Sequence, residues 1–270
     1  MRAHRYTFIT YIGFAASLVF LFFGGIGCSN GGTTNDMRKG LPDTLNVAME
    51  LSPMGMIMEE DTLTGYSYEI LKNICQNNGI VFNPITYTSL ESAIEDAKNN
   101  KIDIFIFNTP VTALIRNFFI TTEPLYLDRQ VLIQNKTISP DSLIKTHQDL
   151  EGAKIYVARN FALTDRINHL SNELGASIEV VELDSITERE LINKINTGEL
   201  QLGAIARSSI IPLLKDYPDL DISVELSLNQ FRAWMLNPSD TVLRDSLNTW
   251  ISKFKETDDF KKLSVRYHLD

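Results

Sequence analysis

The segment NNKIDI at residues 99–104 is similar in its pattern of polar and apolar residues to the segment TGELQL at residues 197–202. Each copy follows a helix-like segment and leads into an apolar run of the kind that forms a buried strand. Segments of the same character lie at the same places upstream of both copies. We therefore expect two successive βαβαβ units, each too small to be the whole molecule.

The first unit alternates expected strands with amphipathic helices, and the strands fall at residues 44–49, 81–87 and 104–107. A helix is predicted from Tyr66, after a turn at residues 62–65, with an apolar face formed by Ile70, Leu71, Ile74 and Cys75. The sequence TSLE at residues 88–91 is typical of a capping box that opens a second helix.

The second unit repeats this order, with strands predicted at residues 153–158 and 178–181 and a helix at residues 164–173. A second capping box, SITE at residues 185–188, opens a helix that buries Leu191, Ile192 and Ile195. A strand at residues 231–235 and two helices, around Trp250 and around Leu263, complete the chain. Apolar strands that alternate with helices predict an α/β fold with mostly parallel sheets covered on both faces.

The N-terminus has the layout of a secretory signal peptide. Arg2 and Arg5 precede an apolar run at residues 8–23, which small residues separate from Cys28. A retained membrane helix is the alternative, because residues 8–26 could span a bilayer of about 30 Å. The residues before the cysteine favour cleavage, since GIGC at residues 25–28 resembles a bacterial lipobox, although leucine is usual where Gly25 stands.

We therefore expect a signal peptide at residues 1–27 and a lipidated Cys28 that begins a flexible tether, residues 28–43. Two or three acyl chains hold a protein to a membrane firmly. The expected location is the periplasmic side of the cell envelope. With Cys28 lipidated, Cys75 has no cysteine partner and is expected to be an inert core residue.

Composition excludes several function classes. Without Arg2 and Arg5, 23 basic residues face 34 acidic residues, a net charge of −11 with neutral histidines. Nucleic acid is therefore not an expected partner. His147, His169 and His268 are scattered without metal-ligand spacing, and no G-x-S-x-G, H-E-x-x-H or phosphate-loop motif occurs. We expect no metal, no cofactor and no enzyme activity. Catalysis by a pair of carboxylates that distant segments bring together is the alternative.

Several short sequence segments, in this order and with this spacing, resemble segments of the family 3 extracellular solute-binding proteins. The matching segments are GYSYEIL at residues 65–71, KIDI at 101–104, TEPLY at 122–126, DLEGAK at 149–154, TGEL at 197–200 and FRAW at 231–234. The wording YEIL at residues 68–71 is closest to the sensor domain of the membrane-bound lytic transglycosylase F family. That family's catalytic domain has no counterpart among these segments, so its cleavage activity is not expected.

The resemblance implies a two-lobed periplasmic binding protein fold of type II, with two hinge crossovers, that closes on a ligand as a monomer. It implies lobe one at residues 44–134, lobe two at residues 135–227 and a return to lobe one at residues 228–270. The ligand cleft then lies at the carboxyl ends of the parallel strands.

Two ligand contacts of the amino-acid receptors in this family are missing. Ile115 stands where the family has an arginine that meets the ligand carboxylate, and Arg116 follows one residue late. Ala206 stands where the family has an aspartate that meets the ammonium, and Arg207 follows it. A free α-amino acid held in the usual way is therefore not expected. Arg207 with Arg159 and Arg116 favours an acidic, acylated or peptidoglycan-derived solute, and surface or interlobe ion pairs are the alternative role for these arginines.

Other ligand-binding candidates follow from their positions near the ends of strands or the starts of helices. They are Met54, Met56, Tyr66, Asn108, Thr109, Thr112, Asn160 and Thr164. The methionines could line an adaptable apolar wall or simply pack beneath a loop.

Two functions fit these features of the sequence. The first is a receptor that delivers a small solute, amino-acid-like, peptide or cell-wall fragment, to an ABC-type transporter. The second is a regulatory or sensory lipoprotein that binds muropeptides and modulates a cell-wall enzyme or another envelope partner.

Overall fold

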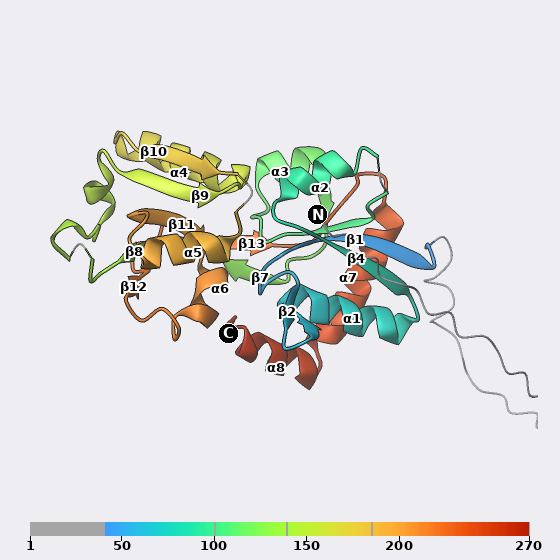
Figure 1. The fold of residues 1–270 in the computed structure, drawn as a ribbon. Coiled ribbons are helices and arrows are strands. Elements are labelled where there is room, and N and C mark those ends of the chain that lie inside the picture. The colour runs from blue at the N-terminus through green and yellow to red at the C-terminus, as the bar shows by residue number, and fades with distance from the viewer. Residues whose placement is uncertain (1–40, 100, 139, 185, 270) are drawn as a thin grey trace, which may run out of the picture.

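A computed structural model describes residues 41–99, 101–138, 140–184 and 186–269. The predicted signal peptide and Cys28 lie outside these residues. The described chain forms two lobes side by side, joined by two extended crossing segments (Figure 1). The predicted two-lobed α/β architecture is thus confirmed. No helix in these ranges is long and apolar enough to cross a membrane.

Lobe one is built on a five-stranded sheet. In spatial order its strands are β4 (Val81–Tyr87), β1 (Thr44–Glu50), β5 (Ile104–Ile106), β14 (Met235–Leu236) and β6 (Ile120–Thr121). The helices of this lobe are α1 (Tyr66–Asn78), α2 (Leu90–Asp96), α3 (Ala113–Phe118), α7 (Thr241–Lys255) and α8 (Asp258–Arg266). A hairpin of β2 (Ile57–Glu59) and β3 (Thr62–Thr64) lies between β1 and α1 in the chain.

Lobe two repeats the arrangement. Its sheet contains β10 (Glu179–Leu183), β9 (Lys154–Ala158), β11 (Leu202–Ala206), β8 (Gln130–Asn135) and β12 (Leu220–Asp221), in that spatial order. The helices are α4 (Phe161–Leu174), α5 (Glu188–Asn196) and α6 (Arg207–Ile210), with short 3₁₀ turns η1 (Pro140–Ser142), η2 (His147–Leu150) and η3 (Ile211–Leu213). In both sheets the βαβ strands pair in parallel, and β14 and β8 add antiparallel strands.

The crossing segments are β7 (Tyr126–Asp128) and β13 (Gln230–Arg232), which pair antiparallel with each other. Because β8 pairs with β11 and β12, residues 130–135 belong to lobe two, and the sheet pairing moves the end of lobe one from the predicted residue 134 to the crossing strand β7. The predicted strand at residues 231–235 is divided. Its first part crosses between the lobes as β13, and its last residue joins the lobe-one sheet in β14.

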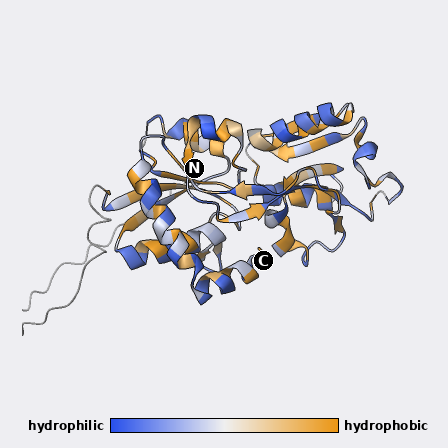
Figure 2. Cartoon of the chain, turned by 180° about the vertical axis from the view of Figure 1, so that it is seen from behind, coloured by the Kyte–Doolittle hydropathy of each residue, from blue (hydrophilic) through white to orange (hydrophobic). Residues whose placement is uncertain are grey.

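Both sheets are covered on two faces by hydrophobic clusters, as the apolar strands predict. In lobe one, one cluster packs α1, α7 and α8 against the sheet and a second packs α2 and α3 against the other face. Lobe two likewise has two clusters. In Figure 2 the helices alternate hydrophobic (orange) and hydrophilic (blue) residues along their length, as helices with one buried face do. Cys75 lies in the first cluster, where burial raises the pKa of its thiol to about 12 and keeps it unreactive.

Helix starts follow local hydrogen bonding that differs slightly from the sequence prediction. The capping box predicted at residues 88–91 is wrong: Ser89 caps α2 and accepts from the backbone N–H of Ser92. The second box lies two residues later than predicted, between Thr187 and Glu190. Helix α4 begins three residues early because Asn160 accepts from the N–H of Leu163. In each case a side chain that could reach a free N–H set the boundary.

Gly65, at the start of α1, is expected to be among the least replaceable glycines. Its φ is 134°, and a Cβ there would lie 2.3 Å from the carbonyl oxygen of Gly55. We expect Gly65→Ala to lower the free energy of unfolding by more than about 2 kcal/mol, since strained backbone alone costs about 1–3 kcal/mol. Chemical denaturation measures this loss. Gly175→Ala is the control: φ is 64° but nothing lies within 4 Å of the added Cβ, so a loss of about 1 kcal/mol is expected. Equal losses in the two variants would contradict the role of the close approach to Gly55.

Candidate functional site

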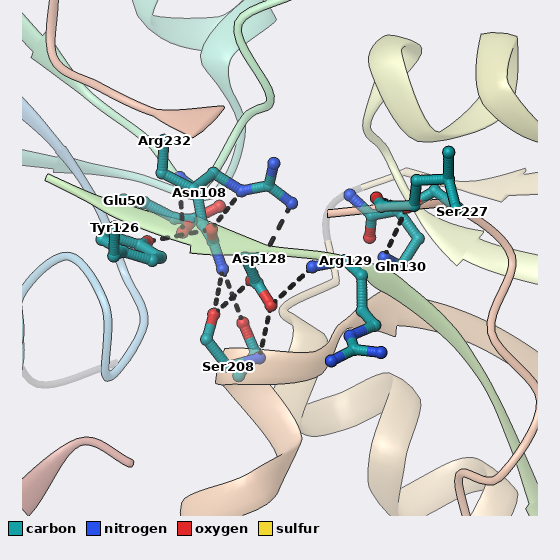
Figure 3. A network of polar contacts seen from close by, with 11 residues as sticks. Glu50, Asn108, Tyr126, Asp128, Arg129, Gln130, Ser208, Ser227 and Arg232 are labelled. Atoms are coloured by element: carbon teal, nitrogen blue, oxygen red, sulfur yellow. Dashed lines mark hydrogen bonds and ion pairs between the residues drawn. The ribbon is translucent and has the colours of Figure 1, made fainter. Parts of the chain in front are cut away.

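Buried charges lie on the two crossing strands. Arg232 of β13 is 1% exposed and Asp128 of β7 is 5% exposed. Their closest charged atoms, Arg232 Nη2 and Asp128 Oδ2, are 3.8 Å apart. Figure 3 shows both side chains at the centre of a polar network between the lobes. Charges this deeply buried are stable only with polar partners, so the surrounding residues decide what this region can do.

Lobe one supplies the partners that follow its strands. Glu50 ends β1, and its Oε2 accepts from Ser52 Oγ at 2.8 Å and from the backbone N of Asn108 at 3.3 Å. Asn108 follows β5, and its Oδ1 accepts from Arg232 Nε at 2.8 Å and from the Tyr126 hydroxyl at 3.0 Å. These side chains meet because β1 and β5 are parallel neighbours whose carboxyl ends share one edge of the sheet.

Lobe two supplies Ser208 and Ser209, in the first turn of α6 directly after β11. Asn108 Nδ2 donates to Ser208 Oγ at 2.9 Å and to Ser209 Oγ at 3.2 Å. Asp128 in turn accepts from the backbone N of Ser208 at 3.2 Å and from its hydroxyl at 2.6 Å. The two lobes are therefore joined by direct hydrogen bonds at the crossing strands, which is a closed arrangement.

The site holds more acidic than basic side chains. Glu50, Asp128 and Glu188 surround Arg232, and desolvation lowers the pKa of the guanidinium while Asp128 and the other acids oppose that change. Among the described residues, Arg232 Nη1 and Nη2 have no hydrogen-bond partner. Burial raises the pKa of the Tyr126 hydroxyl well above its ordinary value, so that hydroxyl stays protonated and donates to Asn108.

The carboxylates of Glu50 and Glu188 predict a pH dependence. Burial raises the pKa of Glu188 to about 8, and the Glu50 charge adds to the shift. Burial also raises the pKa of Glu50. Because the folded state holds these protons more tightly than the unfolded chain, the stabilisation from Glu188 is complete below the ordinary pKa of 4.5 and is lost as pH rises through about 8, and Glu50 contributes in the same direction.

We therefore expect the free energy of unfolding to fall between about pH 5 and about pH 8, and to fall less in Glu188→Gln, which cannot ionise. Chemical denaturation at a series of pH values measures the slope. Glu95→Gln, at an exposed position of α2, serves as control and should keep the wild-type slope. A Glu188→Gln slope equal to that of the wild type would contradict the assignment.

Two spaces between the lobes adjoin this network. A polar cavity of about 20 Å³ is bordered by Glu50 and Thr109 of lobe one and by Arg159, Asn160 and Glu188 of lobe two. A larger groove of about 340 Å³ lies between the loop from β1 to β2 and the helices α5 and α6. The closed lobes thus leave room for a small polar group next to a larger chamber.

The structure gathers some of the predicted ligand residues and not others. Asn108 is at the centre of the network, Thr109, Arg159 and Asn160 border the polar cavity, and Met54 borders a small space beside Asn108. Arg159 also forms an ion pair with Asp184, in which Nη1 and Oδ1 are 3.5 Å apart.

Of the remaining predicted residues, Tyr66 adjoins the network, since its ring meets that of Tyr126 edge-on with the centroids 5.3 Å apart. Met56 and Tyr66 belong to the core of lobe one. Thr112 caps α3 and accepts from the N–H of Ile115. Thr164 donates to Glu182. Arg116 is exposed on α3, and Arg207 is half-buried at the start of α6.

The sequence patterns alone do not single out Glu50, Asp128, Glu188, Ser208, Ser209 and Arg232. A signal for Arg232 was present, because it is a charged residue inside the strand-like phrase FRAW at residues 231–234. Glu50 likewise ends a strand that is otherwise apolar. Neither signal shows that these two residues meet. In the described parts of the chain, no group of three or more His, Cys, Asp or Glu side chains could hold a metal ion.

Comparisons with known proteins agree with this architecture. The profile of the bacterial extracellular solute-binding proteins, family 3, matches residues 45–270. A membrane-bound lytic murein transglycosylase F from Desulfosudis oleivorans is 24% identical over 213 residues, which are 77% of this chain and 45% of that protein. One from Pseudomonas fluorescens Pf-5 is 20% identical over 83% of this chain and 46% of its own length. The chain thus spans about half the length of the curated relatives it matches.

Solved structures share the fold at low sequence identity. A mutant of the arginine-binding protein ArgBP from T. maritima has a TM-score of 0.72 at 20% identity and covers 88% of this chain and 100% of its own. A putative L-cystine ABC transporter protein from Listeria monocytogenes has a TM-score of 0.72 at 18% identity, over 83% of this chain and 95% of its own. At such identity the likeness shows a common fold.

Proposed function

The chain belongs to the bacterial extracellular solute-binding proteins of family 3, and we propose on that basis that it captures a small polar solute between its lobes by hinge closure. The observation that carries the proposal is the bridge from Asn108 in lobe one to Ser208 and Ser209 in lobe two. These groups lie over the only two strands that join the lobes in the described chain, β7 and β13. Bending those strands would expose the same polar groups to a ligand.

The proposed ligand carries at least one charged group and is amino-acid-like, a peptide or a cell-wall fragment. Arg232, whose two terminal nitrogens have no hydrogen-bond partner among the described residues, suits a carboxylate. Glu50 and Glu188 suit an ammonium. Ile115 and Ala206, at the positions of the usual family contacts, are 1% and 3% exposed apolar residues. An α-amino acid would therefore be held by different residues from those of the amino-acid receptors, with Arg159 beside the cavity as an additional cation.

We further propose that the protein is anchored through Cys28 on the periplasmic side of the envelope and is a binding protein without catalysis. The matched region covers 45% and 46% of the two transglycosylases, so their named activity is not transferred to this chain. The proposed partner is an ABC permease, which the names of several structural neighbours support. A sensory role with a cell-wall enzyme is the second candidate, because the curated relatives are murein transglycosylases.

A ligand screen by thermal shift tests the proposal. Both crossing strands and all four hydrophobic clusters lie within residues 41–269, so a fragment that begins at residue 37 retains the complete two-lobed fold. Amino acids, dipeptides and muropeptides are the probes. A ligand at about 100 times its Kd should stabilise the fold by about 2.7 kcal/mol.

Small-angle X-ray scattering of the same samples reports whether the lobes change their separation. Stabilisation by an amino acid or a dipeptide supports delivery to a transporter, and stabilisation by muropeptides alone supports the sensory role. The absence of any stabilising solute, together with an unchanged scattering profile, would contradict capture between the lobes.

A further inference from the structure

The groove of about 340 Å³ between the lobes has apolar walls from both sides. Lobe one contributes Leu51, Ile57 and Met58, and lobe two contributes Ile192 and Leu213. In Figure 1 this region lies where the β2 hairpin of lobe one approaches α5 and α6 of lobe two. The groove belongs to neither hydrophobic core alone, so its shape depends on the closed arrangement.

The lobe-one wall of this groove is incompletely covered. Leu51 is 43% exposed and Met58 is 63% exposed, although Ile192 and Leu213 opposite them are 1% and 8% exposed. Exposed apolar surface that faces a second apolar surface across a chamber is typical of a small-molecule site. An aliphatic group in the groove would cover Leu51 and Met58 and lose its own contact with water.

Glu188 lies where the groove meets the polar cavity, because it borders both. Its Oε2 is buried and, among the described residues, has no hydrogen-bond partner. Glu50 borders the same cavity, whose volume of about 20 Å³ suits one small polar group. An unpartnered buried carboxylate oxygen at the end of an apolar chamber is complementary to a hydrogen-bond donor that carries positive charge.

The remaining charges do not reverse this preference. Glu91 and Arg159 also border the polar cavity, so three carboxyl groups there face one guanidinium. Arg232 and Asp128 act on Glu188 from outside the cavity with opposite signs. Glu59 and Arg189 border the groove and offset each other. A cation at Glu188 is therefore favoured over an anion, which would meet Glu50 and Glu188 together.

We propose that the groove holds the aliphatic arm of a ligand whose ammonium group lies between Glu188 and Glu50. The inference rests on the proposed capture of a solute between the lobes and narrows that solute to an amphiphilic cation. It uses no ligand contact with Arg232, which borders neither the groove nor the polar cavity. The ligand class is a primary amine with an unbranched or lightly branched apolar chain.

Linear alkylammonium ions of increasing length test this inference with the fragment from residue 37. Each added methylene that enters the groove should strengthen binding about fourfold, until the groove is filled. Hexanoate has a similar arm with the opposite charge and is expected to bind at least about tenfold more weakly than hexylammonium. Isothermal titration calorimetry measures both affinities.

Two pairs of variants separate the arm from the charge. Met58→Ser should weaken hexylammonium at least about fivefold, whereas Val81→Ser, an equally exposed apolar position on β4 away from the groove, should not change the affinity. Glu188→Gln should weaken hexylammonium about tenfold or more, and Glu95→Gln should leave it unchanged. Met58 is exposed and Glu188 is partly exposed, so neither substitution is expected to prevent folding. Circular dichroism checks that each variant folds.

Equal binding of hexanoate and hexylammonium, affinity that does not change with chain length, or no effect of Met58→Ser and Glu188→Gln would each overturn the inference. Failure of hexylammonium to bind would also overturn the inference. These outcomes differ from failure of the proposed function. A solute from the wider screen that closes the lobes but whose affinity is unaffected by both variants would leave solute capture intact and remove the groove site.

Discussion

Arg232→Met is expected to lower the free energy of unfolding by about 3–5 kcal/mol, because removing one member of a buried ion pair leaves an uncompensated charge. The guanidinium is 1% exposed, pairs with Asp128 and donates to Asn108. Methionine fills a similar volume but leaves Glu50, Asp128 and Glu188 without their central cation. Chemical denaturation of the fragment from residue 37 measures the loss.

Arg266→Met is the matched control for this variant. Arg266 also pairs with a carboxylate, Glu69, but its side chain is 55% exposed. Exposed pairs contribute up to about 1 kcal/mol, so only a small loss is expected.

A second measurement separates lost charge compensation from lost packing. The destabilisation by Arg232→Met should shrink as pH is lowered from above about 8 toward about 5, because Glu188, whose pKa is raised to about 8, and Glu50, whose pKa is also raised, become protonated and then need no cation. A loss of the same size at every pH would show that packing, and not charge, makes Arg232 important.

Asn108→Leu is expected to destabilise the closed arrangement by about 3 kcal/mol or more. The side chain makes four polar contacts, as donor to Ser208 and Ser209 and as acceptor from Tyr126 and Arg232. Leucine has a similar size but leaves these buried partners unsatisfied, at a cost of about 1–3 kcal/mol for each group that finds no other partner. The loss is measured by chemical denaturation.

The same variant should also loosen the contact between the lobes. Small-angle X-ray scattering is expected to show a larger radius of gyration for Asn108→Leu than for the wild type, because its two bonds to lobe two are direct links across the hinge. Thr109→Val is the control, since Thr109 is the next residue and is also buried. A change in unfolding free energy within about 1 kcal/mol and an unchanged radius are expected for it. If both variants behaved alike, the bridge at Asn108 would not be what joins the lobes.

The network between the lobes gives the crossing strands two roles. They connect the lobes covalently, and through Asp128 and Arg232 they place opposite charges at the closing surface. Side chains from both lobes then contact these charges, so closure and the satisfaction of buried polar groups occur together. A solute that replaces the Asn108 to Ser208 bridge with its own polar groups would close the lobes at a different separation. Solute identity and lobe geometry are therefore expected to vary together.

Much of the fold could be predicted from the sequence because it depends on local patterns. Apolar runs and helical periodicity report which residues are buried, and the burial of Ile70, Leu71, Ile192 and Ile195 agrees with the pattern. The repeat at residues 99–104 and 197–202 predicted two similar βαβαβ units, which the two sheets confirm. Helix starts were less predictable, since several side chains within one or two residues of each other can cap the same N–H groups.

The candidate site was decided by tertiary structure. Asn108 contacts Ser208 across 100 residues and Arg232 across 124, and no periodicity within a window of one or two helical turns carries information about such pairs. The division of residues 231–235 between a crossing strand and a lobe-one strand likewise depends on which strand each half pairs with. By itself the sequence determined the two α/β units and their buried faces, because burial leaves a local pattern. Only the folded chain determined which charged residues meet between the lobes, because long-range pairing is chosen by the geometry of the whole sheet.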